Sequence, residues 1–368
     1  MHVMDKQTKT LSVRVRDKHA PLLRRMAFEV NQVWNAANQR TAQSGMVRTP
    51  LVGVETYMPP PSVYDIQKQL AGVQKEQQWA IGSSTVQEII AEHGKKRKQA
   101  KRNKLRWRVS GGPRRSLGWV PFKMRATKWV NGQVKFAGHH FAVWDSYGLN
   151  DYEFRAGSFS EDARGRWYFN VAVKVEGKPT HSTSGVGIDL GLKTTAVCSD
   201  GKTLERGDFY RDLEEKLGKQ QRAGNKKQVR NIHAKIKNRR KDAIQKFSTK
   251  VVEEHGLIVV GNVSPSGLAK TKMAKSVLDA GWAMLKAQLK YKAIARSAVF
   301  IEVNEAYSTQ ACSSCGSIPD SSPKGMDGLE VREWSCSCCG ALHDRDINAA
   351  KNILALGIEG PVDGISAL

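Results

Sequence analysis

Five of the six cysteines of this chain fall between Cys312 and Cys339. They include two C-x-x-C pairs, Cys312 with Cys315 and Cys336 with Cys339, separated by twenty residues. Two such pairs direct four thiolates toward one point about 2.3 Å away, as a tetrahedral Zn²⁺ requires. Cys338 is left over, because Cys339 keeps the two-residue spacing and precedes a glycine. Four thiolates leave no open position, so the pattern predicts a structural zinc and disfavours unrelated free cysteines.

A formal net charge of +24, from 59 Lys and Arg against 35 Asp and Glu, is the second constraint. Such an excess implies a polyanionic partner. The 368 residues indicate two or three domains, and a hydrophobic share of 40% excludes a disordered tail. The sequence has no run of 18 apolar residues, and its first residues do not resemble a secretory signal. We therefore expect a soluble cytoplasmic protein.

The first part of the sequence predicts a strand followed by helices. Apolar and polar residues alternate over Thr8–Asp17, which is typical of a half-buried strand. Apolar residues at helical spacing follow from Pro21, and a later helix is expected from Ser84 to about Lys104. Nine of the fourteen residues from Lys95 to Arg108 are Lys or Arg, so this helix ends in a strongly basic run.

Short β segments with hairpin turns follow from about Gly118 to Glu176. We expect them to combine with the first strand into a β-barrel formed by residues 1–17 and 106–180. The helices of residues 18–105 would then be an insertion into this barrel. Residues 176–185 have the composition of a linker.

The second half of the sequence predicts an α/β domain with a mixed sheet, because strands and helices interchange along it. The domain is expected to begin with a strand and a hairpin at residues 185–205, followed by a basic helical tract at 213–254 and a strand at 257–260. A helix at 274–296, a strand at 298–303, a cysteine-rich loop at 312–339 and a final helix at 345–357 complete it.

Aspartates stand at the ends of two of these elements. Asp189 ends the first apolar strand, although an aspartate there often serves only the turn. At the final helix, Asp344 is expected to cap the N-terminus and to leave Asp346 in the first turn, facing the sheet. Two acids at one sheet edge suit two-metal phosphodiester hydrolysis, in which ions about 4 Å apart stabilise the attacking and leaving oxygens. Oxygen ligands indicate Mg²⁺ or Mn²⁺.

Five motifs together resemble the TnpB family. In chain order they are "GIDLGLKTTAVCSDG", the basic helix ending "NRRKDAIQKFSTK", "MAKSVLDAGW", the double C-x-x-C and "HDRDINAAKNIL". TnpB proteins are RNA-guided DNA endonucleases of bacterial insertion sequences and relatives of the type V CRISPR effectors. The resemblance is close over residues 185–357. It is looser in the N-terminal half, where it rests on "WVPFK" and on the order of strand, helices and barrel.

The resemblance implies an α/β RNase H-like (RuvC) nuclease domain with an inserted zinc-binding module, and an N-terminal wedge β-barrel with a helical recognition insertion. The nuclease domain would comprise residues 181–311 and 340–368, with the zinc-binding module at 312–339. The wedge barrel would comprise residues 1–17 and 106–180, with the recognition insertion at 18–105. The resemblance also implies a guide RNA from the transposon end and a double-stranded DNA target beside a short adjacent motif. A monomer with one RNA and no membrane association completes the expectation.

One position departs from the family's pattern. In the family the first catalytic Asp falls on Asp189 and the last on Asp346. The second acid, a Glu that ends the fourth strand of the nuclease domain, falls on Gly261, which Asn262 follows. This departure raises the alternative of a nuclease-inactive protein.

Glu305 is in a position to supply the missing acid. In an RNase H-like sheet the fifth strand lies beside the fourth, and neighbouring strands are about 4.8 Å apart, within reach of a Glu side chain. Glu305 follows the fifth strand at the end where Asp189 lies, whereas Glu302 is mid-strand. We therefore predict Asp189, Glu305 and Asp346 as the catalytic acids and magnesium ligands. A solvated Glu305, or Asn262 as a neutral oxygen ligand, is the alternative.

Basic tracts at Lys95–Arg108 and Lys216–Lys250 favour contact with a nucleic-acid backbone over plain solvated helix faces. Trp107, Trp119 and Trp129 are interpreted as core aromatics in preference to base-stacking platforms.

The sequence leaves three functions open. They are an active RNA-guided DNA endonuclease with a relocated Glu, a nuclease-inactive RNA-guided DNA binder, and an RNA-free resolvase or transposase on the same fold. We favour the first, because both aspartates are present beside an available Glu305.

Overall fold

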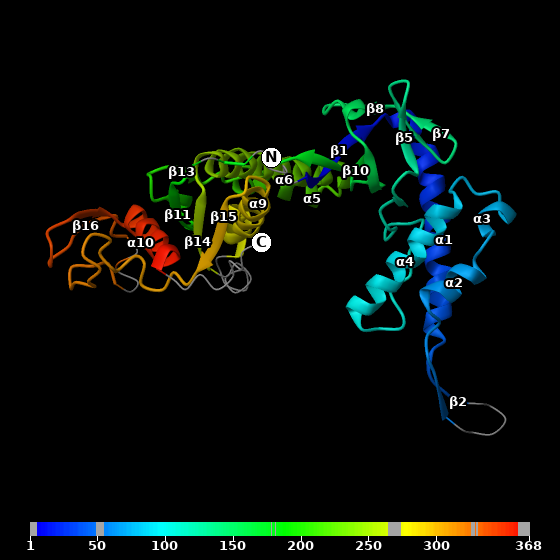
Figure 1. The fold of residues 1–368 in the computed structure, drawn as a ribbon, viewed down its shortest axis with the longest axis horizontal. Helices are drawn as coiled ribbons and strands as arrows, with labels where there is room; N and C mark the ends of the chain where they lie inside the picture. The colour runs from blue at the N-terminus through cyan, green and yellow to red at the C-terminus, as the bar shows by residue number, and fades with distance from the viewer. Residues whose placement is uncertain are drawn as a thin grey trace, which may run out of the picture. The chain divides into compact units, whose positions relative to one another are not determined.

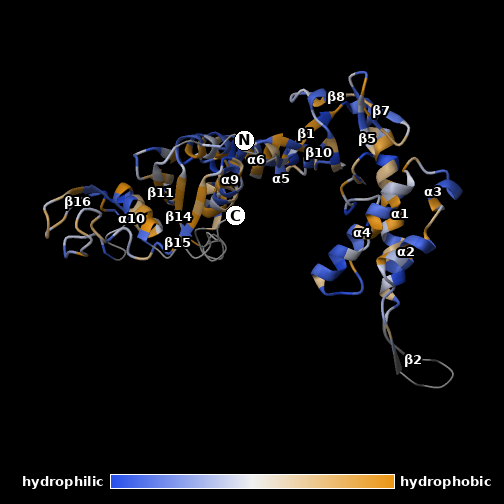
Figure 2. Ribbon diagram, viewed as in Figure 1, coloured by the Kyte–Doolittle hydropathy of each residue, from blue (hydrophilic) through white to orange (hydrophobic). Residues whose placement is uncertain are grey.

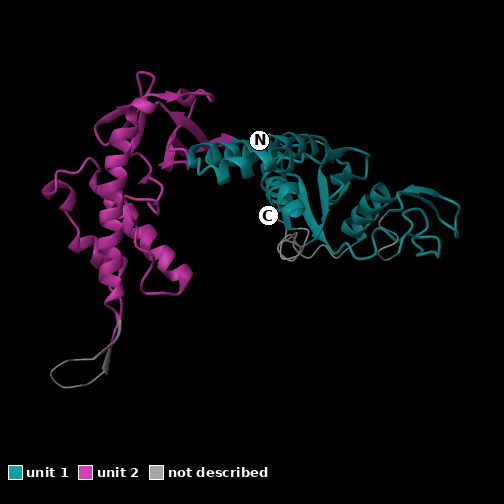
Figure 3. Ribbon diagram, turned by 180° about the vertical axis from the view of Figure 1, so that it is seen from behind, with its two compact units in different colours: residues 1–5, 176–368 teal, residues 6–175 magenta. Residues whose placement is uncertain are grey.

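The computed structural model describes residues 6–48, 55–177, 179–180, 182–263, 274–324, 328 and 330–359. The chain divides into two compact units, one of residues 6–175 and the other of residues from 176 onward (Figure 3). Each unit has its own hydrophobic core. Within the described residues, no helix is both long enough and apolar enough to cross a membrane.

A five-stranded sheet and a three-stranded meander form the β part of the unit of residues 6–175 (Figure 1). The sheet has the order β4-β9-β10-β1-β8, and the meander has the order β5-β6-β7. The strands β1 and β4 to β10 are, in turn, Lys6–Val15, Trp119–Phe122, Thr127–Val130, Gln133–Phe136, His139–Phe141, Val143–Trp144, Phe154–Glu161 and Trp167–Glu176. In the core of this unit, Phe122, Phe159 and Phe169 pack together with ring centroids 5.2–5.9 Å apart.

The expected barrel is not closed in this structure. Among the described strands the order of the sheet has two ends, β4 and β8, so the sheet is open. β8 has only two residues, and helices α1 (Ala20–Ala42) and α4 (Ser83–Ala100) pack against β4. The prediction of short strands is therefore confirmed, and no closed barrel is detected among the described strands.

The helical part of this unit differs in detail from the prediction. Besides α1 and α4 it contains α2 (Val63–Gln69), α3 (Val73–Glu76) and a hairpin of β2 with β3, at Gly45–Arg48 and Glu55–Met58. Two short 3-10 helices lie at Asp17–His19 and Leu149–Asp151. Helix α4 ends at Ala100 and not near Lys104, because Lys101 adopts a left-handed backbone conformation with φ of 50°.

A mixed five-stranded sheet with the order β13-β12-β11-β14-β15 is the centre of the second unit. β11 to β15 are Gly185–Asp189, Thr194–Cys198, Thr203–Glu205, Leu257–Gly261 and Val299–Val303. β11, β14 and β15 run parallel, and β12 and β13 are antiparallel to their neighbours. The predicted neighbourhood of the first, fourth and fifth strands is thus confirmed. In Figure 2, β14 carries the orange of hydrophobic residues.

Helices cover both faces of this sheet. They are α5 (Arg211–Arg222), α6 (Lys226–Glu254), α8 (Ala274–Ala280), α9 (Trp282–Ala295) and α10 (Arg345–Glu359). Val186 and Ile188 share a core with α6 and α9, whereas a Cβ on the intervening Gly187 would meet the Ala350 carbonyl oxygen of α10 at 1.9 Å. Because successive strand residues point to opposite faces, α10 lies on the face opposite α6 and α9. The helix predicted over residues 274–296 is interrupted at Gly281, which has a φ of 72°.

Candidate functional site

The carboxyl ends of β11, β14 and β15 bring two of the predicted acids, Asp189 and Glu305, to one place. β11 and β14 pair with Ile188 opposite Val260, so Gly261 is the next residue along β14, beside Asp189. Glu305 lies two residues beyond the end of β15. All three strands are parallel, so these residues lie at one edge of the sheet.

The Glu305 side chain occupies the space that a side chain at position 261 would fill. A Cβ built on Gly261 would lie 1.8 Å from Glu305 Oε2, 2.9 Å from its Cδ and 3.1 Å from its Cβ. Real Cβ atoms do not approach other atoms so closely, so a residue larger than glycine at position 261 is incompatible with this placement of Glu305. The carboxylate of Glu305 therefore reaches the end of β14 from the neighbouring strand.

Burial is the main influence on the ionisation of Asp189 and Glu305. Burial and the nearby negative charges of Glu305 and Asp346 together raise the pKa of Asp189 to about 7, although Arg345 lowers it. Burial also raises the pKa of Glu305, against the lowering effects of Lys286 and of a hydrogen bond from the Val263 N–H.

Glu305 Oε2 is itself buried and has no hydrogen-bond partner in the described part of the chain. A buried carboxylate oxygen without a partner is costly unless a cation or water completes it. The site thus fits a divalent cation with oxygen ligands.

Asp346 lies in the first turn of α10, as the sequence predicts. The Asp344 side chain accepts a hydrogen bond of 2.8 Å from the Ile347 N–H and so caps the helix. Asp346 Oδ2 lies 2.5 Å from Arg332 Nη1, an ion pair that partly neutralises this acid.

A compact metal site brings three or more side-chain ligand atoms within 4.8 Å of one another. The described residues contain two such clusters, and the three predicted acids do not form either of them. Asp189, Glu305 and Asp346 thus do not converge on a single ion here.

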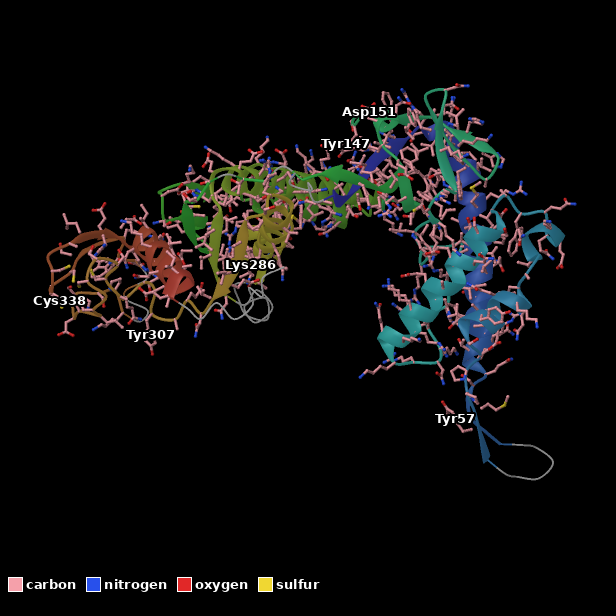
Figure 4. The ribbon with its side chains drawn as sticks, viewed as in Figure 1. Tyr57, Tyr147, Asp151, Lys286, Tyr307 and Cys338 are labelled. Carbon is pink, nitrogen blue, oxygen red and sulfur yellow. The ribbon has the colours of Figure 1, made fainter. Side chains whose placement is uncertain are left out.

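Glu302, the other acid of β15, is excluded from the site by its own partner. Lys286, labelled in Figure 4, donates from Nζ to Glu302 Oε2 at 2.8 Å. Asn262, the proposed neutral ligand, has an exposed side chain, and its backbone N–H is bound to the Val303 carbonyl at 2.9 Å.

Cys312, Cys315, Cys336 and Cys339 form one of the two close clusters of ligand atoms. The Sγ atoms of Cys312 and Cys339 are 3.7 Å apart, and those of Cys315 and Cys336 are 3.8 Å apart. Four sulfurs at about 2.3 Å from a tetrahedral zinc are about 3.8 Å from one another. The four-cysteine cluster is therefore compatible with Zn²⁺. Cys338, labelled in Figure 4, is exposed and lies outside the cluster.

The second cluster of ligand atoms consists of Asp200, Glu254 and His255 at the opposite end of β11 and β14. Lys202 Nζ pairs with both carboxylates, at 2.6 Å from Asp200 and in closer contact still with Glu254. This ammonium already supplies the positive charge, so we do not interpret the cluster as a metal site.

Two asparagines of α10 bind the cysteine loop to the helix that carries Asp346. Asn348 is 1% exposed, accepts a hydrogen bond of 2.8 Å from the Ser313 N–H and donates one of 2.7 Å to the Ala311 carbonyl. Asn352 donates to the carbonyls of Ser308 and Ala311 at 2.8 and 2.7 Å. The segment that follows Glu305 and the first cysteine pair is therefore fixed against α10.

His343 and Arg332 were not identified from the sequence. His343 Nε2 lies 3.0 Å from Cys312 Sγ, where an N–H donor would stabilise a thiolate, and burial lowers the pKa of its imidazole. Only the folding of the cysteine loop brings these two residues to their partners. Asn348 and Asn352, in contrast, have a signal in the sequence: two amides four residues apart face one side of a mostly apolar helix.

Two family models match consecutive parts of the chain. The OrfB_IS605 family, described as "Probable transposase", matches residues 168–272, and the Cas12f1-like TNB domain matches residues 282–353. A protein of Streptomyces pristinaespiralis named as a candidate RNA-guided DNA endonuclease is 30% identical over 269 residues, which are 68% of this chain and 65% of that protein. InsQ of Escherichia coli K12, named in the same way, is 30% identical over 223 residues, 52% of this chain and 54% of that protein.

The chain thus spans 65% and 54% of the length of these two relatives. A cryo-EM structure of a Cas12f1–sgRNA–target DNA complex contains a chain with a similar fold. Its TM-score is 0.59 at 12% identity, and the match covers 95% of this chain and 98% of that chain.

Proposed function

Because the chain belongs to the TnpB family, whose OrfB_IS605 region and Cas12f1-like TNB domain it contains, we propose that it is an RNA-guided DNA endonuclease. In this proposal a guide RNA from the transposon end pairs with one strand of a double-stranded target, and the protein reads a short adjacent motif. Cleavage is then a phosphodiester hydrolysis at the end of β11, in a RuvC-like site.

The observation that carries the proposal of activity is the position of the Glu305 carboxylate. This carboxylate takes the place of the glutamate that the family has at the position of Gly261. One of its oxygens is buried without a hydrogen-bond partner among the described residues. Asp189, Glu305 and Asp346 would together hold Mg²⁺ or Mn²⁺. The bound ions would stabilise the attacking and leaving oxygens of the scissile phosphate. A nuclease-inactive binder would have no need for a third carboxylate at this place.

The residues of the site also have roles that precede chemistry. The raised pKa of Asp189 means that a proton competes with a cation for this carboxylate near neutral pH. Arg332 neutralises Asp346 until a cation takes its place. The four cysteines would hold a structural zinc, and Asn348 and Asn352 would transmit the position of the zinc-binding module to the helix of Asp346.

Exposed cations on the pair of helices α5 and α6 support a nucleic-acid partner. On α6 they are Lys226, Lys227, Arg230, Lys235, Lys237, Arg239, Lys241, Lys246 and Lys250. Such a density of exposed positive charge can neutralise phosphates of a nucleic acid. We assign residues 6–175 to guide and target recognition, with the wedge and recognition regions of the family as their counterparts. A monomer with one RNA is the simplest assembly.

The proposal is tested by recovering RNA with the protein and changing its guide segment. RNA that copurifies is sequenced, and the protein is then loaded with a guide directed at a plasmid site of choice. We expect Mg²⁺-dependent cleavage at the new site, and none by Asp189→Ala. Guided binding without cleavage by the wild type would establish the inactive binder. Unchanged specificity after removal of the RNA would refute RNA guidance.

A further inference from the structure

Trp107 is an exposed tryptophan in a basic hollow of the unit of residues 6–175. Its side chain is 45% exposed, and it lines the hollow together with Arg102, Lys104 and Arg106. Lys104 Nζ lies 6.0 Å from the centre of its ring. A large aromatic surface that stands in water among cations is available to a partner.

The backbone on both sides of Trp107 is held by side-chain amides of α1. Asn38 accepts from the Leu105 N–H at 2.8 Å and donates to the Leu105 carbonyl at 2.9 Å. Asn35 binds the N–H and the carbonyl of Arg108 in the same way, at 2.8 and 2.9 Å. These paired bonds fix residues 105 and 108 against the helix, so that the two residues between them project outward.

The neighbouring tryptophans do not share this exposure. The Arg108 guanidinium lies 4.2 Å from the ring centre of Trp34 and 4.9 Å from that of Trp119, and so covers both. Trp34 is only 6% exposed. Trp107 is therefore held as the free aromatic surface of this segment.

The segment of sequence that carries Trp107 has charged residues of one sign only. Between Glu92 and Asp145 the sequence contains no Asp or Glu. In the described part of the chain, Arg102, Lys104 and Arg106 form no ion pair with an acid. Their charges remain available for a polyanion.

We propose that Trp107 is a stacking platform for an unpaired base of the guide RNA, with Arg102, Lys104 and Arg106 on the adjacent phosphates. This inference rests on the proposed function, because it takes the bound polyanion to be the guide. Aromatic rings that stack on bases, together with cations that follow the backbone, are the general means of binding single-stranded nucleic acid. RNA is favoured over DNA, since proteins recognise RNA mainly at unpaired bases of loops, bulges and ends.

The test measures binding of two probes by the full-length protein freed of RNA. One probe is the RNA extracted from the purified wild type and end-labelled, and the other is a 20-nucleotide oligothymidylate. Trp107→Ala should weaken RNA binding by about 5- to 150-fold, whereas Trp107→Phe should stay within about threefold of the wild type. Trp107→Ala should leave the salt dependence unchanged, while Arg106→Gln should lower the slope of log Kd against log salt by about 0.7.

Each outcome has a defined meaning. Equal RNA affinity of wild type and Trp107→Ala overturns the platform. A loss in both Trp107 variants, accompanied by a lower melting temperature, overturns it in favour of a structural tryptophan. A loss confined to the oligothymidylate overturns the RNA assignment in favour of a DNA strand. If no RNA accompanies the wild type and none binds to it, the proposed function fails, which is distinct from a failure of Trp107 alone.

Discussion

Under the proposed function, replacing Gly261 by alanine should strongly reduce cleavage, although no acidic residue is replaced. The new Cβ would lie 1.8 Å from Glu305 Oε2. To reach the 3.4 Å of an ordinary contact, the oxygen must retreat by roughly 1.6 Å, and displacements of about 1 Å in an active site lower rates about 100-fold. We therefore expect cleavage by Gly261→Ala to fall at least about 100-fold, which corresponds to about 2.7 kcal/mol of barrier.

The assay is guided plasmid cleavage at saturating Mg²⁺, with rates taken from single-turnover time courses. Glu305→Gln keeps the shape of the side chain and removes its charge, so it should be inactive. Glu302→Gln is the matched control, because it makes the same change three residues away on β15, where Lys286 is the partner. It should cleave within about twofold of the wild type, because the Glu302 side chain is 41% exposed and the ion pairs of exposed carboxylates contribute little. Guide and target binding should be the same in all variants.

The exchange Gly261→Glu with Glu305→Gly should restore part of the activity. Gly261 does not have the positive φ that only glycine tolerates well, and the atoms nearest to a Cβ at position 261 all belong to Glu305. The double variant thus moves the carboxylate to β14 and clears its space. Wild-type rates for Gly261→Ala or for Glu305→Gln would refute the reasoning, because the third acid would then lie elsewhere.

Three further predictions concern the rest of the second unit. Cys312→Ser should lose one bound zinc per chain in elemental analysis, whereas Cys338→Ser should keep it; zinc retained by Cys312→Ser would contradict the assignment. Asp189→Asn should raise the melting temperature in magnesium-free buffer by about 4–10 °C at pH 8. Folding raises the pKa of Asp189 from 3.8 to about 7, so its ionisation destabilises the fold increasingly as the pH rises through this range, and the advantage should disappear near pH 4. A difference that does not depend on pH would count against this origin. Asn348→Ala should lower the free energy of unfolding in urea by about 1–3 kcal/mol, since the half-buried backbone groups of residues 311 and 313 lose their hydrogen bonds. An unchanged urea midpoint would show that water replaces the lost hydrogen bonds.

The nuclease-like sheet was accessible from the sequence because its determinants are local. Apolar runs mark β11, β14 and β15, and the spacing of neighbouring strands places Glu305 within reach of the end of β14. The cap by Asp344 follows from the rules for helix N-termini. These inferences needed only short stretches of sequence and one assumed strand order.

The features that the sequence did not predict depend on contacts between segments that are distant in the sequence. Whether the sheet of residues 6–175 closes is decided by its edge strands β4 and β8, which no local pattern specifies. The pairing of Arg332 with Asp346 requires the folded cysteine loop. Trp107 was interpreted as a core residue, but the bonds from Asn35 and Asn38 to its neighbours leave it exposed.

The backbone contact between β11 and α10 has a consequence for metal selectivity under the proposed function. Gly187 allows the Ala350 carbonyl to approach so closely that the separation of Asp189 and Asp346 is set by the main chain of two packed elements. Glu305, in contrast, stands on a loop. Mg²⁺ requires short bonds in near-octahedral geometry, whereas Ca²⁺ accepts longer and more numerous bonds. Discrimination between ions of different radius should therefore depend on the Glu305 loop. Changes in the length or rigidity of this loop should alter which ion is preferred, while the distance between the two aspartates stays constant.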